Sequence, residues 1–302
     1  CSPSRYNCIS EILHYWTLDN TGNDNIGGKN GTLIGGGSFV NAVINEGFSN
    51  INAGGDNCIN TTYDTKDFNY NWSVCLFFNV TDEVPAGGNM YIWGKYDTNG
   101  KRSIALSLNS TPRVRASWSN DGTTLDRIAS PTDIQYNKTY FTCLTYNQTH
   151  ATIYLDGVRE DTYDRTIDSI YSSSLTPFII GASFSTEPTT NNEFEGPIDE
   201  ILLINRTLSD AAVLAIYTDY QSGIRPYDQS SDVPDLSLEF GPAVTRVNML
   251  GCGPSITNYS SYPQGQTSVI GIDYLCNNGT GIGDVQVNLS TSPNTGWDIL
   301  IS

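Results

Sequence analysis

The sequence predicts an all-β protein built from two β-sandwiches, and two observations lead to this fold class. Apolar and polar residues alternate through most of the chain, as in Val74-Leu76-Phe78-Val80 and Ile104-Leu106-Leu108. A period of two is that of a strand with one buried face. Gly, Asn and Asp separate the alternating stretches, as at Asp156-Gly157 after Ile153-Leu155, and these residues are typical of tight turns between strands.

One segment, residues 208–220, has the pattern of a helix instead. Ser209 is suited to cap its N-terminus, and Asp210 suits the positive end of the helix dipole. Gly223 follows as a C-terminal cap, and Pro226 blocks any continuation. We therefore expect one short helix at the end of the first domain.

A polar, proline-containing stretch after this helix divides the chain into two predicted domains. The first covers residues 1–223, with its core at about 10–220, and a linker follows at 224–235. The second domain covers residues 236–302. Because an Ig-type sandwich usually takes about 100 residues, we expect this smaller domain to be incomplete or to receive a strand from elsewhere.

Four blocks of the first domain resemble the laminin-G-like, concanavalin A-like jelly roll of secreted microbial surface proteins. They are His14 to Asp19 with Asp24, Gly27 and Asn30-Gly31-Thr32-Leu33; Asn71 to Val80; Tyr140 to Gly157, which contains "YLDG"; and Phe194 to Tyr217. The stretch "YPQGQTSVIGIDYLCNNGTGIGDVQVNLS" in the second domain resembles the small Ig-like or CARDB-like sandwiches of archaeal and bacterial surface proteins. The resemblance implies a jelly-roll sandwich of about residues 10–220 followed by a smaller Ig-like sandwich.

Asn-x-Ser/Thr sequons indicate a secreted glycoprotein. They are about twofold more frequent than composition alone gives, and Asn109 and Asn288 both fall in the solvent-facing phase of their predicted strands. Glycosylation at these sites implies a eukaryotic or archaeal secretory route. The predicted sites are Asn30, Asn60, Asn71, Asn79, Asn109, Asn137, Asn147, Asn205, Asn258, Asn278 and Asn288.

Seven cysteines without a CxxC pair indicate disulfides and an oxidising compartment rather than zinc. Cys252 and Cys276 are the only two in the second domain and are expected to pair, and Cys1 and Cys8 can close an N-terminal loop. Three remain in the first domain, so one thiol is left over, either buried or used between subunits. These three are Cys58, Cys75 and Cys143.

The net charge of -17, from 32 acidic and 15 basic residues, disfavours nucleic acid and anionic membranes as partners. The sequence also holds no apolar run of the roughly 20 residues that a membrane span needs. The acidic excess favours bound cations, with Ca²⁺ first. In the resembled fold the first and last strands lie side by side, which would bring Asp19 or Asp24 towards Asp199 and give a structural calcium site. The alternative is an Asx-turn loop without an ion.

Catalysis is not indicated, so the sequence predicts a protein that is not an enzyme. Glycanases of this fold carry a Glu-x-Asp-x-(x)-Glu cluster on one strand, and the nearest acidic group is interrupted by Gly196-Pro197. That acidic group consists of Glu193, Glu195, Asp199 and Glu200. His14 is interpreted as a core or edge residue, and His150 as a solvated residue at a hairpin tip.

Aromatic residues near predicted turns offer a possible sugar platform. The candidates are Trp93, Tyr96 and Trp118, although core packing is the favoured role for each of them.

Our first functional hypothesis is a structural subunit of an extracellular filament, sheath or surface layer. Trp297, Ile299 and Ile301 share one face of the last predicted strand. They are expected to mediate head-to-tail self-assembly by contacting the N-terminal segment, residues 1–10, or the jelly roll of the next copy. The alternative is a Ca²⁺-dependent lectin or adhesin that binds extracellular glycans. A glycan hydrolase is a third hypothesis, which the missing carboxylate cluster disfavours.

Overall fold

The computed structural model describes residues 11–50, 56–61, 63, 68, 70–97, 99–163, 169–171, 176–186 and 189–225. Every helix and strand in this part belongs to one compact unit, Ser10–Gly223. The predicted Ig-like domain and residues 226–235 of the predicted linker lie outside the described residues, so the division of the chain into two domains stays a prediction.

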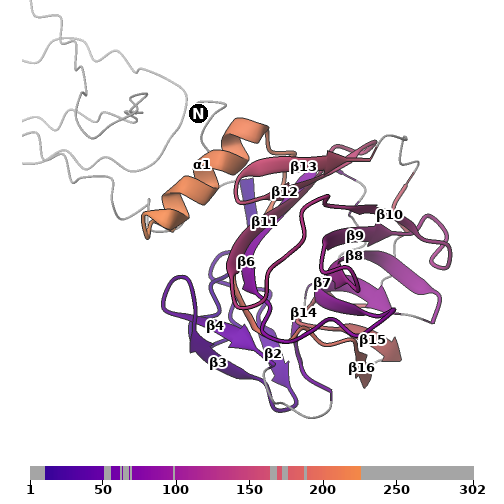
Figure 1. Ribbon diagram of the computed structural model, residues 1–302, viewed down its shortest axis with the longest axis horizontal. Helices are drawn as coiled ribbons and strands as arrows, with labels where there is room; N and C mark the ends of the chain where they lie inside the picture. Colours follow the sequence, from indigo (N-terminus) through magenta and orange to yellow (C-terminus); the bar gives the residue numbers. More distant parts are fainter. Residues whose placement is uncertain are drawn as a thin grey trace, which may run out of the picture. The chain divides into compact units, whose positions relative to one another are not determined.

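Two antiparallel sheets form a jelly-roll sandwich, which confirms the predicted all-β fold for this unit (Figure 1). Sheet A has eight strands, and its path runs β13 (Val158–Thr162), β12 (Ala151–Leu155), β11 (Thr139–Tyr146), β6 (Trp72–Asn79), β17 (Pro197–Ile204), β4 (Glu46–Ser49) and β3 (Ser38–Asn41), with β1 (Ile12–Trp16) also paired to β17. Sheet B has nine, and its path runs β10 (Asp126–Ala129), β9 (Val114–Trp118), β8 (Lys101–Asn109), β7 (Asn89–Asp97), β14 (Ile179–Ile180), β5 (Cys58–Thr61) and β2 (Gly31–Ile34), with β15 (Ser183–Thr186) and β16 (Thr189–Asn191) beside it.

The hydrophobic core lies between the two sheets and is supplied by alternate residues of their strands. The residues of β6 and β8 that were predicted to face inward all belong to this core, and their side chains are almost completely buried. Four of the five tryptophans of the sequence are fully buried as well. These inward-facing residues and tryptophans are Val74, Leu76, Phe78, Ile104, Leu106, Leu108, Trp16, Trp72, Trp93 and Trp118.

The first and last strands of the sandwich pair with each other. Strand β1 runs antiparallel to β17, with Tyr15 opposite Leu202 and Trp16 opposite Ile201. This is the adjacency that the resemblance implied. The pairing closes the sandwich between segments far apart in the sequence, since Ile12 faces Ile204.

Two tight backbone positions depend on residues that tolerate a positive φ. The β12–β13 hairpin turns at Asp156 and Gly157, with φ of 48° and 80°, as expected for an Asp-Gly turn of the type that suits twisted hairpins. At Gly196, where φ is 140°, an added Cβ would lie 1.9 Å from the carbonyl oxygen of Asn79. Only glycine fits at this entry to β17.

The predicted helix is present as α1 (Asp210–Gln221), within two residues of its expected bounds. Ser209 caps it by accepting a hydrogen bond from the backbone N–H of Ala212. The chain leaves the helix through Gly223, which has a φ of 73° and donates its N–H to the carbonyl of Tyr220. No helix of the described residues is long and apolar enough to cross a membrane.

Helix α1 covers the outer face of sheet A (Figure 1). Tyr220 lies edge-on to Phe77 of β6, with ring centroids 5.2 Å apart, and Tyr217 lies 5.6 Å from Phe141 of β11. One face of the sandwich is therefore occupied by the chain itself.

Candidate functional site

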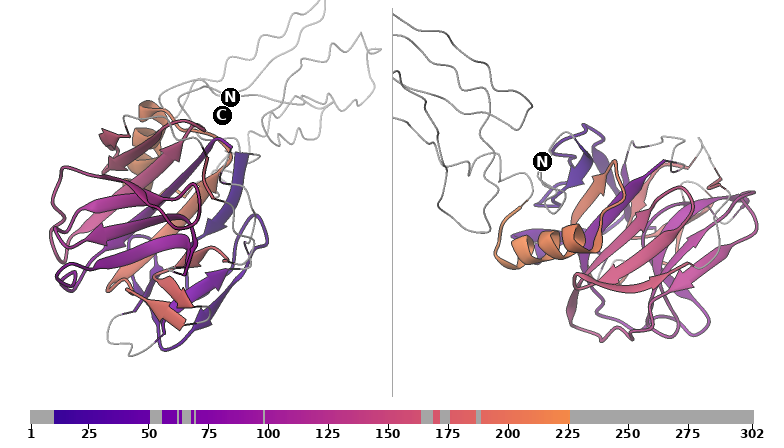
Figure 2. Two further views of the ribbon diagram at one scale, coloured as in Figure 1. Left: turned by 90° about the vertical axis from the view of Figure 1, so that its right-hand side faces the viewer. Right: turned by 90° about the horizontal axis from the view of Figure 1, so that it is seen from above.

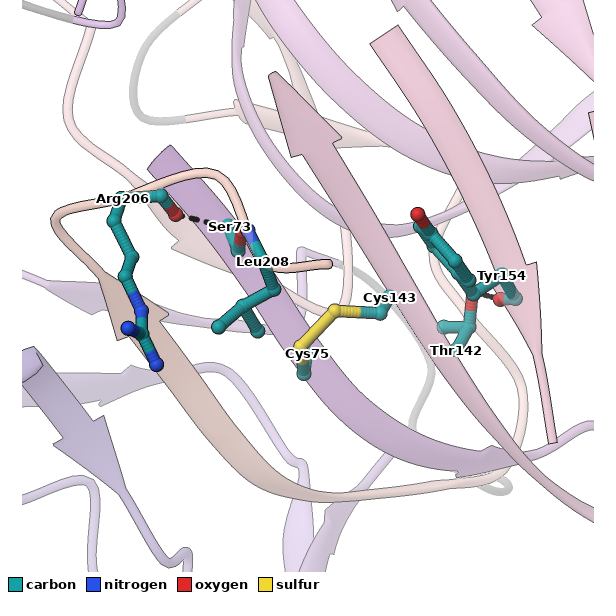
Figure 3. Close-up of a disulfide and its surroundings, with 7 residues drawn as sticks. All are labelled: Ser73, Cys75, Thr142, Cys143, Tyr154, Arg206 and Leu208. Atoms are coloured by element: carbon teal, nitrogen blue, oxygen red, sulfur yellow. Dashed lines mark hydrogen bonds between the residues drawn. A yellow bond between two sulfur atoms is a disulfide. The ribbon is translucent and has the colours of Figure 1, made fainter. Parts of the chain in front are cut away.

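The disulfide of the sandwich joins the two central strands of sheet A. Cys75 of β6 lies directly opposite Cys143 of β11, and the two are bonded (Figure 3). Cys58 is the thiol left over, buried beside Ile179 and Phe184. The sequence left open whether that thiol was buried or used between subunits, and the structure places it in the interior. The other predicted pairs, Cys252 with Cys276 and Cys1 with Cys8, lie outside the described residues.

The thiol of Cys58 is chemically quiet. Burial raises its pKa to about 12, and the negative charges of Glu193 and Asp56 add to this. Because the thiolate is the reactive form, Cys58 has no nucleophilic role at neutral pH.

Hydrogen bonds around the disulfide hold sheet A to the connection before α1 (Figure 3). The hydroxyl of Ser73 donates to the carbonyl of Arg206 at 2.8 Å and accepts from the N–H of Leu208 at 2.9 Å. Thr142 donates to the carbonyl of Tyr154 at 3.0 Å. These polar groups are used for structure.

Asp24, one of the three predicted calcium ligands, is buried and accepts hydrogen bonds both from strand β1 and from its own loop. Its carboxylate accepts from Nδ1 of His14 at 2.6 Å and from the N–H of Tyr15 at 3.0 Å. The N–H groups of Ile26, Gly27 and Lys29 also donate to it, at 3.1, 3.0 and 2.8 Å. Burial alone would raise its pKa, but the hydrogen bonds from His14 and the backbone outweigh this and lower the pKa to about 2.

The other two predicted ligands contact the hairpin between β3 and β4. Asp19 accepts from the N–H of Glu46 at 3.3 Å, and Asp199 accepts from Val43 and Ile44 at 3.0 and 3.1 Å. Among the described residues, no three His, Cys, Asp or Glu side chains come together so that they could hold a metal ion. Calcium binding by Asp19, Asp24 and Asp199 stays a prediction.

The acidic residues before and within β17 also have internal partners. Glu200 is fully buried and accepts a hydrogen bond from the hydroxyl of Tyr15. Its φ of 57° marks the register shift of β17 against β6. Burial raises the pKa of Glu195, and the charges of Asp82 and Glu193 add to this. Glu193 in turn accepts from the hydroxyl of Thr190.

Eight of the eleven sequons lie in the described residues, and none of these eight asparagines is buried. At Asn109 and Asn147 the side-chain oxygen accepts from the hydroxyl of the sequon threonine, Thr111 or Thr149, at 2.9 Å. Asn258, Asn278 and Asn288 lie outside the described residues. The exposed asparagines are Asn30, Asn71, Asn137, Asn147 and Asn205, and the half-buried ones are Asn60, Asn79 and Asn109.

A small depression of about 100 Å³ lies where β3, β6, β11 and β17 meet. Ligand pockets usually measure about 300–1,000 Å³, so it accepts no more than a fragment of a ligand. It is lined by Asn41, Ala42, Val43, Phe77, Phe78, Asn79, Thr139, Pro197 and Asp199. Because Asn79 is itself a sequon asparagine, we do not take this depression as the binding site.

The outer face of sheet B carries a second cluster of packed side chains. Tyr91 and Tyr96 of β7 pack with Ala105 and Leu125 in a cluster separate from the main core. The two tyrosine rings lie 5.2 Å apart. Among the described residues, no helix covers this face (Figure 2, left).

Three arginines lie around this tyrosine pair. Arg115 of β9 is aligned with Ser107 of β8, which is aligned in turn with Tyr91. Arg127 of β10 lies opposite Ser117. The guanidinium of Arg102 lies 5.9 Å from the ring centroid of Tyr96. We call Asn89, Tyr91, Tyr96, Arg102, Arg115 and Arg127 the arginine–tyrosine face.

The guanidinium of Arg115 is held in place by its surroundings. It donates from Nη2 to the side-chain oxygen of Asn89. Burial lowers the pKa of Arg115, and the positive charge of Arg127 lowers it further. Burial also raises the pKa of Tyr91, so this phenol is neutral at physiological pH.

The aromatic residues considered for a sugar platform are buried, as the favoured packing role predicted. Trp93 and Trp118 are buried in the core, so the favoured packing role holds for them. Tyr96 does lie on the outer face of sheet B, but only 2% of it is exposed. The exposed polar groups above it are arginines, which the sequence analysis did not single out. Their signal was their position in the polar phase of β9 and β10.

Comparison with known families matches residues 53–214 to the concanavalin A-like lectin/glucanases superfamily. No curated protein sequence matches the chain.

Similar solved structures share the fold at low sequence identity. One is domain 4 of an extracellular arabinanase from Geobacillus stearothermophilus in complex with arabinotriose, with 14% identity and a TM-score of 0.52 over 68% of this chain and 98% of that domain. Another is the binding domain of Paraclostridial Mosquitocidal Protein 1, with 12% identity and a TM-score of 0.55 over 70% of this chain and 53% of the other. The receptor-binding domain of botulinum neurotoxin D has 13% identity and a TM-score of 0.52, with the same coverage of 70% and 53%. The match thus spans about half the length of the two toxin domains.

Proposed function

The chain belongs to the concanavalin A-like lectin/glucanase superfamily, and on this basis we propose that it is an extracellular carbohydrate-binding protein of the lectin or adhesin type. The observation that carries the proposal is the arginine–tyrosine face. Arg115, Arg127 and the amide of Asn89 place planar hydrogen-bonding groups together on a sheet face that no described helix covers. Such groups match the hydroxyl and carboxyl oxygens of saccharides in geometry.

The comparisons support a binding function more than a filament subunit. One similar structure is a domain in complex with arabinotriose, and two others are binding domains of toxins. Head-to-tail assembly through Trp297, Ile299 and Ile301 falls outside the described residues and stays a prediction.

An extracellular location rests on two further features. The Cys75–Cys143 disulfide is typical of oxidising compartments. The eight described sequon asparagines are all exposed or half-buried, as attached glycans require.

We propose that most of the eleven sequons are glycosylated, and enzymatic deglycosylation of native material should lower the apparent mass. Unmodified asparagines at most of the eleven sequons in native material would contradict this.

Carbohydrate binding is tested with the whole chain on a glycan array, with and without EDTA. We expect binding to at least one glycan class and a loss of at least tenfold in affinity for Arg127→Ala and Asn89→Ala. Arg159→Ala is the matched control, because Arg159 is exposed on β13 of the other sheet and pairs with Asp210. Loss of binding in EDTA would support the predicted calcium site.

Two results would contradict the proposal. One is the absence of binding to any glycan on the array by correctly folded protein. The other is glycan binding that remains equal in the wild type, Arg127→Ala and Asn89→Ala, because the arginine–tyrosine face would then not be the site.

A further inference from the structure

We propose that Arg115 and Arg127 bind the anionic group of an acidic saccharide, a carboxylate or a sulfate ester, on the outer face of sheet B. This inference rests on the proposed carbohydrate binding and specifies the chemical class of the sugar.

Among the described residues of this acid-rich protein, these two arginines have no carboxylate partner. Arg113, Arg159 and Arg206 each form an ion pair with a nearby carboxylate, at 2.7, 2.6 and 3.0 Å. In the described part of the chain, neither Arg115 nor Arg127 has such a pair. With 32 acidic and 15 basic residues in the sequence, two adjacent cations without a carboxylate are unexpected.

The positive charges of Arg115 and Arg127 also repel each other. The nearby charge of Arg127 lowers the pKa of Arg115, which is half-buried. Repulsion between like charges in a partly buried setting is unfavourable. An anion placed between the two guanidinium groups removes this repulsion and replaces it with attraction, so the empty site favours an anionic ligand.

Arg115 also has a hydrogen-bond donor without an acceptor among the described residues. The Nε atom of Arg115 is shielded from solvent and has no hydrogen-bond acceptor among the described residues. A buried donor without an acceptor costs about 1–3 kcal/mol. A guanidinium binds a carboxylate or a sulfate through a fork of two parallel donors.

The charge of the protein limits the rest of the ligand to a largely neutral molecule. Ser107 and Ser117, which are next to Arg115 and Arg127 in the strand alignment, and Tyr91 are buried and add no exposed polar group to the site. The net charge of -17 repels a long polyanion. A saccharide with one or two acidic groups fits these conditions better than a nucleic acid or a densely sulfated chain.

The test measures binding of matched oligosaccharides to the whole chain by calorimetry. The probes are trigalacturonate, sialyl-lactose and sulfated lactose, each compared with its neutral counterpart, namely the methyl esters and lactose itself. We expect at least one acidic probe to bind tenfold or more tightly than its neutral form, and this preference to weaken as salt is raised. The carboxylate and sulfate probes show which anion is preferred.

Variants assign the preference to the two arginines. Arg115→Gln and Arg127→Gln should reduce the ratio of acidic to neutral affinity to near one. Arg115→Lys should keep only part of it, because lysine has the charge but not the fork. Arg113→Gln is the control, since Arg113 is two residues from Arg115 but is paired with Asp133. Arg127 is exposed, so its variant reports on binding even if an Arg115 variant folds poorly.

The outcomes separate this inference from the proposed function. Equal binding of acidic and neutral probes, or binding of neutral glycans only, would overturn the inference and leave carbohydrate binding intact. An acidic preference that survives both glutamine variants would also overturn it. If no glycan of any kind binds, the proposed function fails with it. An acidic peptide that displaces the best saccharide at equal concentration would overturn the saccharide class.

Discussion

Asp24 shows how much structure one buried carboxylate can hold. It joins strand β1, through His14 and Tyr15, to the loop that follows, through the N–H groups of Ile26, Gly27 and Lys29. A pattern of Asp, Asn and Gly residues predicts a polar loop, but it does not tell whether a carboxylate in that loop binds a cation or backbone amides. Here the described contacts of the Asp24 carboxylate are with β1 and with backbone amides of the loop.

Replacing Asp24 with asparagine should destabilise the sandwich by about 2–4 kcal/mol at pH 7. Asparagine keeps the size of the side chain but turns one acceptor into a donor, which would face N–H groups. Urea unfolding of the whole chain measures the loss. Asp133→Asn is the control and should cost less than about 1 kcal/mol, because Asp133 is exposed and forms only a surface pair with Arg113. Equal losses in the two variants would contradict this role.

The same carboxylate predicts a pH dependence. In the folded protein the pKa of Asp24 is about 2, compared with 3.8 as its ordinary value. The stabilisation by ionised Asp24 is therefore complete above about pH 4 and is lost as the pH falls towards 2. At about 1.4 kcal/mol for each pKa unit, the loss is about 2 kcal/mol. The difference in unfolding free energy between wild type and Asp24→Asn should shrink over this range, and a constant difference would contradict the prediction.

The cysteines give a second prediction at the scale of single residues. Peptide mapping should find Cys75 bonded to Cys143 and Cys58 as a free thiol that an alkylating reagent modifies only after denaturation. Removing the bridge with Cys75→Ala and Cys143→Ala should cost up to about 4 kcal/mol in the chain-entropy model, given the sequence separation of 68. Cys58→Ala is the control that leaves the bridge in place. Rapid alkylation of Cys58 in the native protein would contradict its burial.

At the scale of elements, helix α1 stabilises the sandwich through one face only. Ile216 is fully buried, whereas Leu214 of the same helix is 49% exposed. Ile216→Ala should therefore destabilise the protein by about 2–5 kcal/mol. Leu214→Ala, which removes a side chain of equal size, should cost less than about 1 kcal/mol. Similar effects in thermal or urea unfolding would mean that α1 does not pack against sheet A as described.

Regular elements were predictable from the sequence because burial acts on them with a fixed period. The alternation in β6 and β8 placed Val74, Leu76, Ile104 and Leu106 in the core correctly. The cap at Ser209 and the glycine at 223 gave the bounds of α1 to within two residues. In each case local sequence and tertiary packing favour the same structure.

The arginine–tyrosine face was not predictable because a bulge changes the phase of β7. In a regular strand Tyr91 and Tyr96 would point to opposite faces, since they are five positions apart. The register shifts between Tyr91 and Trp93, and both Ile92 and Trp93 belong to the core. The extra residue brings Tyr96 to the same face as Tyr91. The sequence contains no marker for this shift, and strand pairing with β8 decides it.

At the scale of the whole molecule, the two outer faces of the sandwich have different roles. The outer face of sheet A is used internally, by the disulfide and by the packing of Tyr217 and Tyr220 from α1 (Figure 1). The outer face of sheet B carries Arg115 and Arg127, which form no ion pair with a carboxylate of the described residues, and no described helix covers it (Figure 2). A binding function is thus expected on sheet B, and variants on sheet A serve as structural controls.

The last prediction is that residues 10–223 fold and bind without the rest of the chain. All described strands and α1 lie in this unit, and so does the main hydrophobic core. A fragment of this size should be compact, with a radius of gyration of about 17 Å, and should keep the glycan binding of the whole chain. Small-angle scattering and calorimetry measure both properties.

The same fragment separates binding from assembly. If the whole chain polymerises, the fragment should not, because the predicted contacts involve residues 1–10 and the apolar side chains of Trp297, Ile299 and Ile301. Deleting residues 1–10, or ending the chain before Trp297, should abolish polymers while leaving the affinity for glycans unchanged. A fragment that is unfolded, or that forms the same polymers as the whole chain, would show that the boundary near residue 223 is misplaced. Glycan binding that needs residues 226–302 would place the site outside the sandwich.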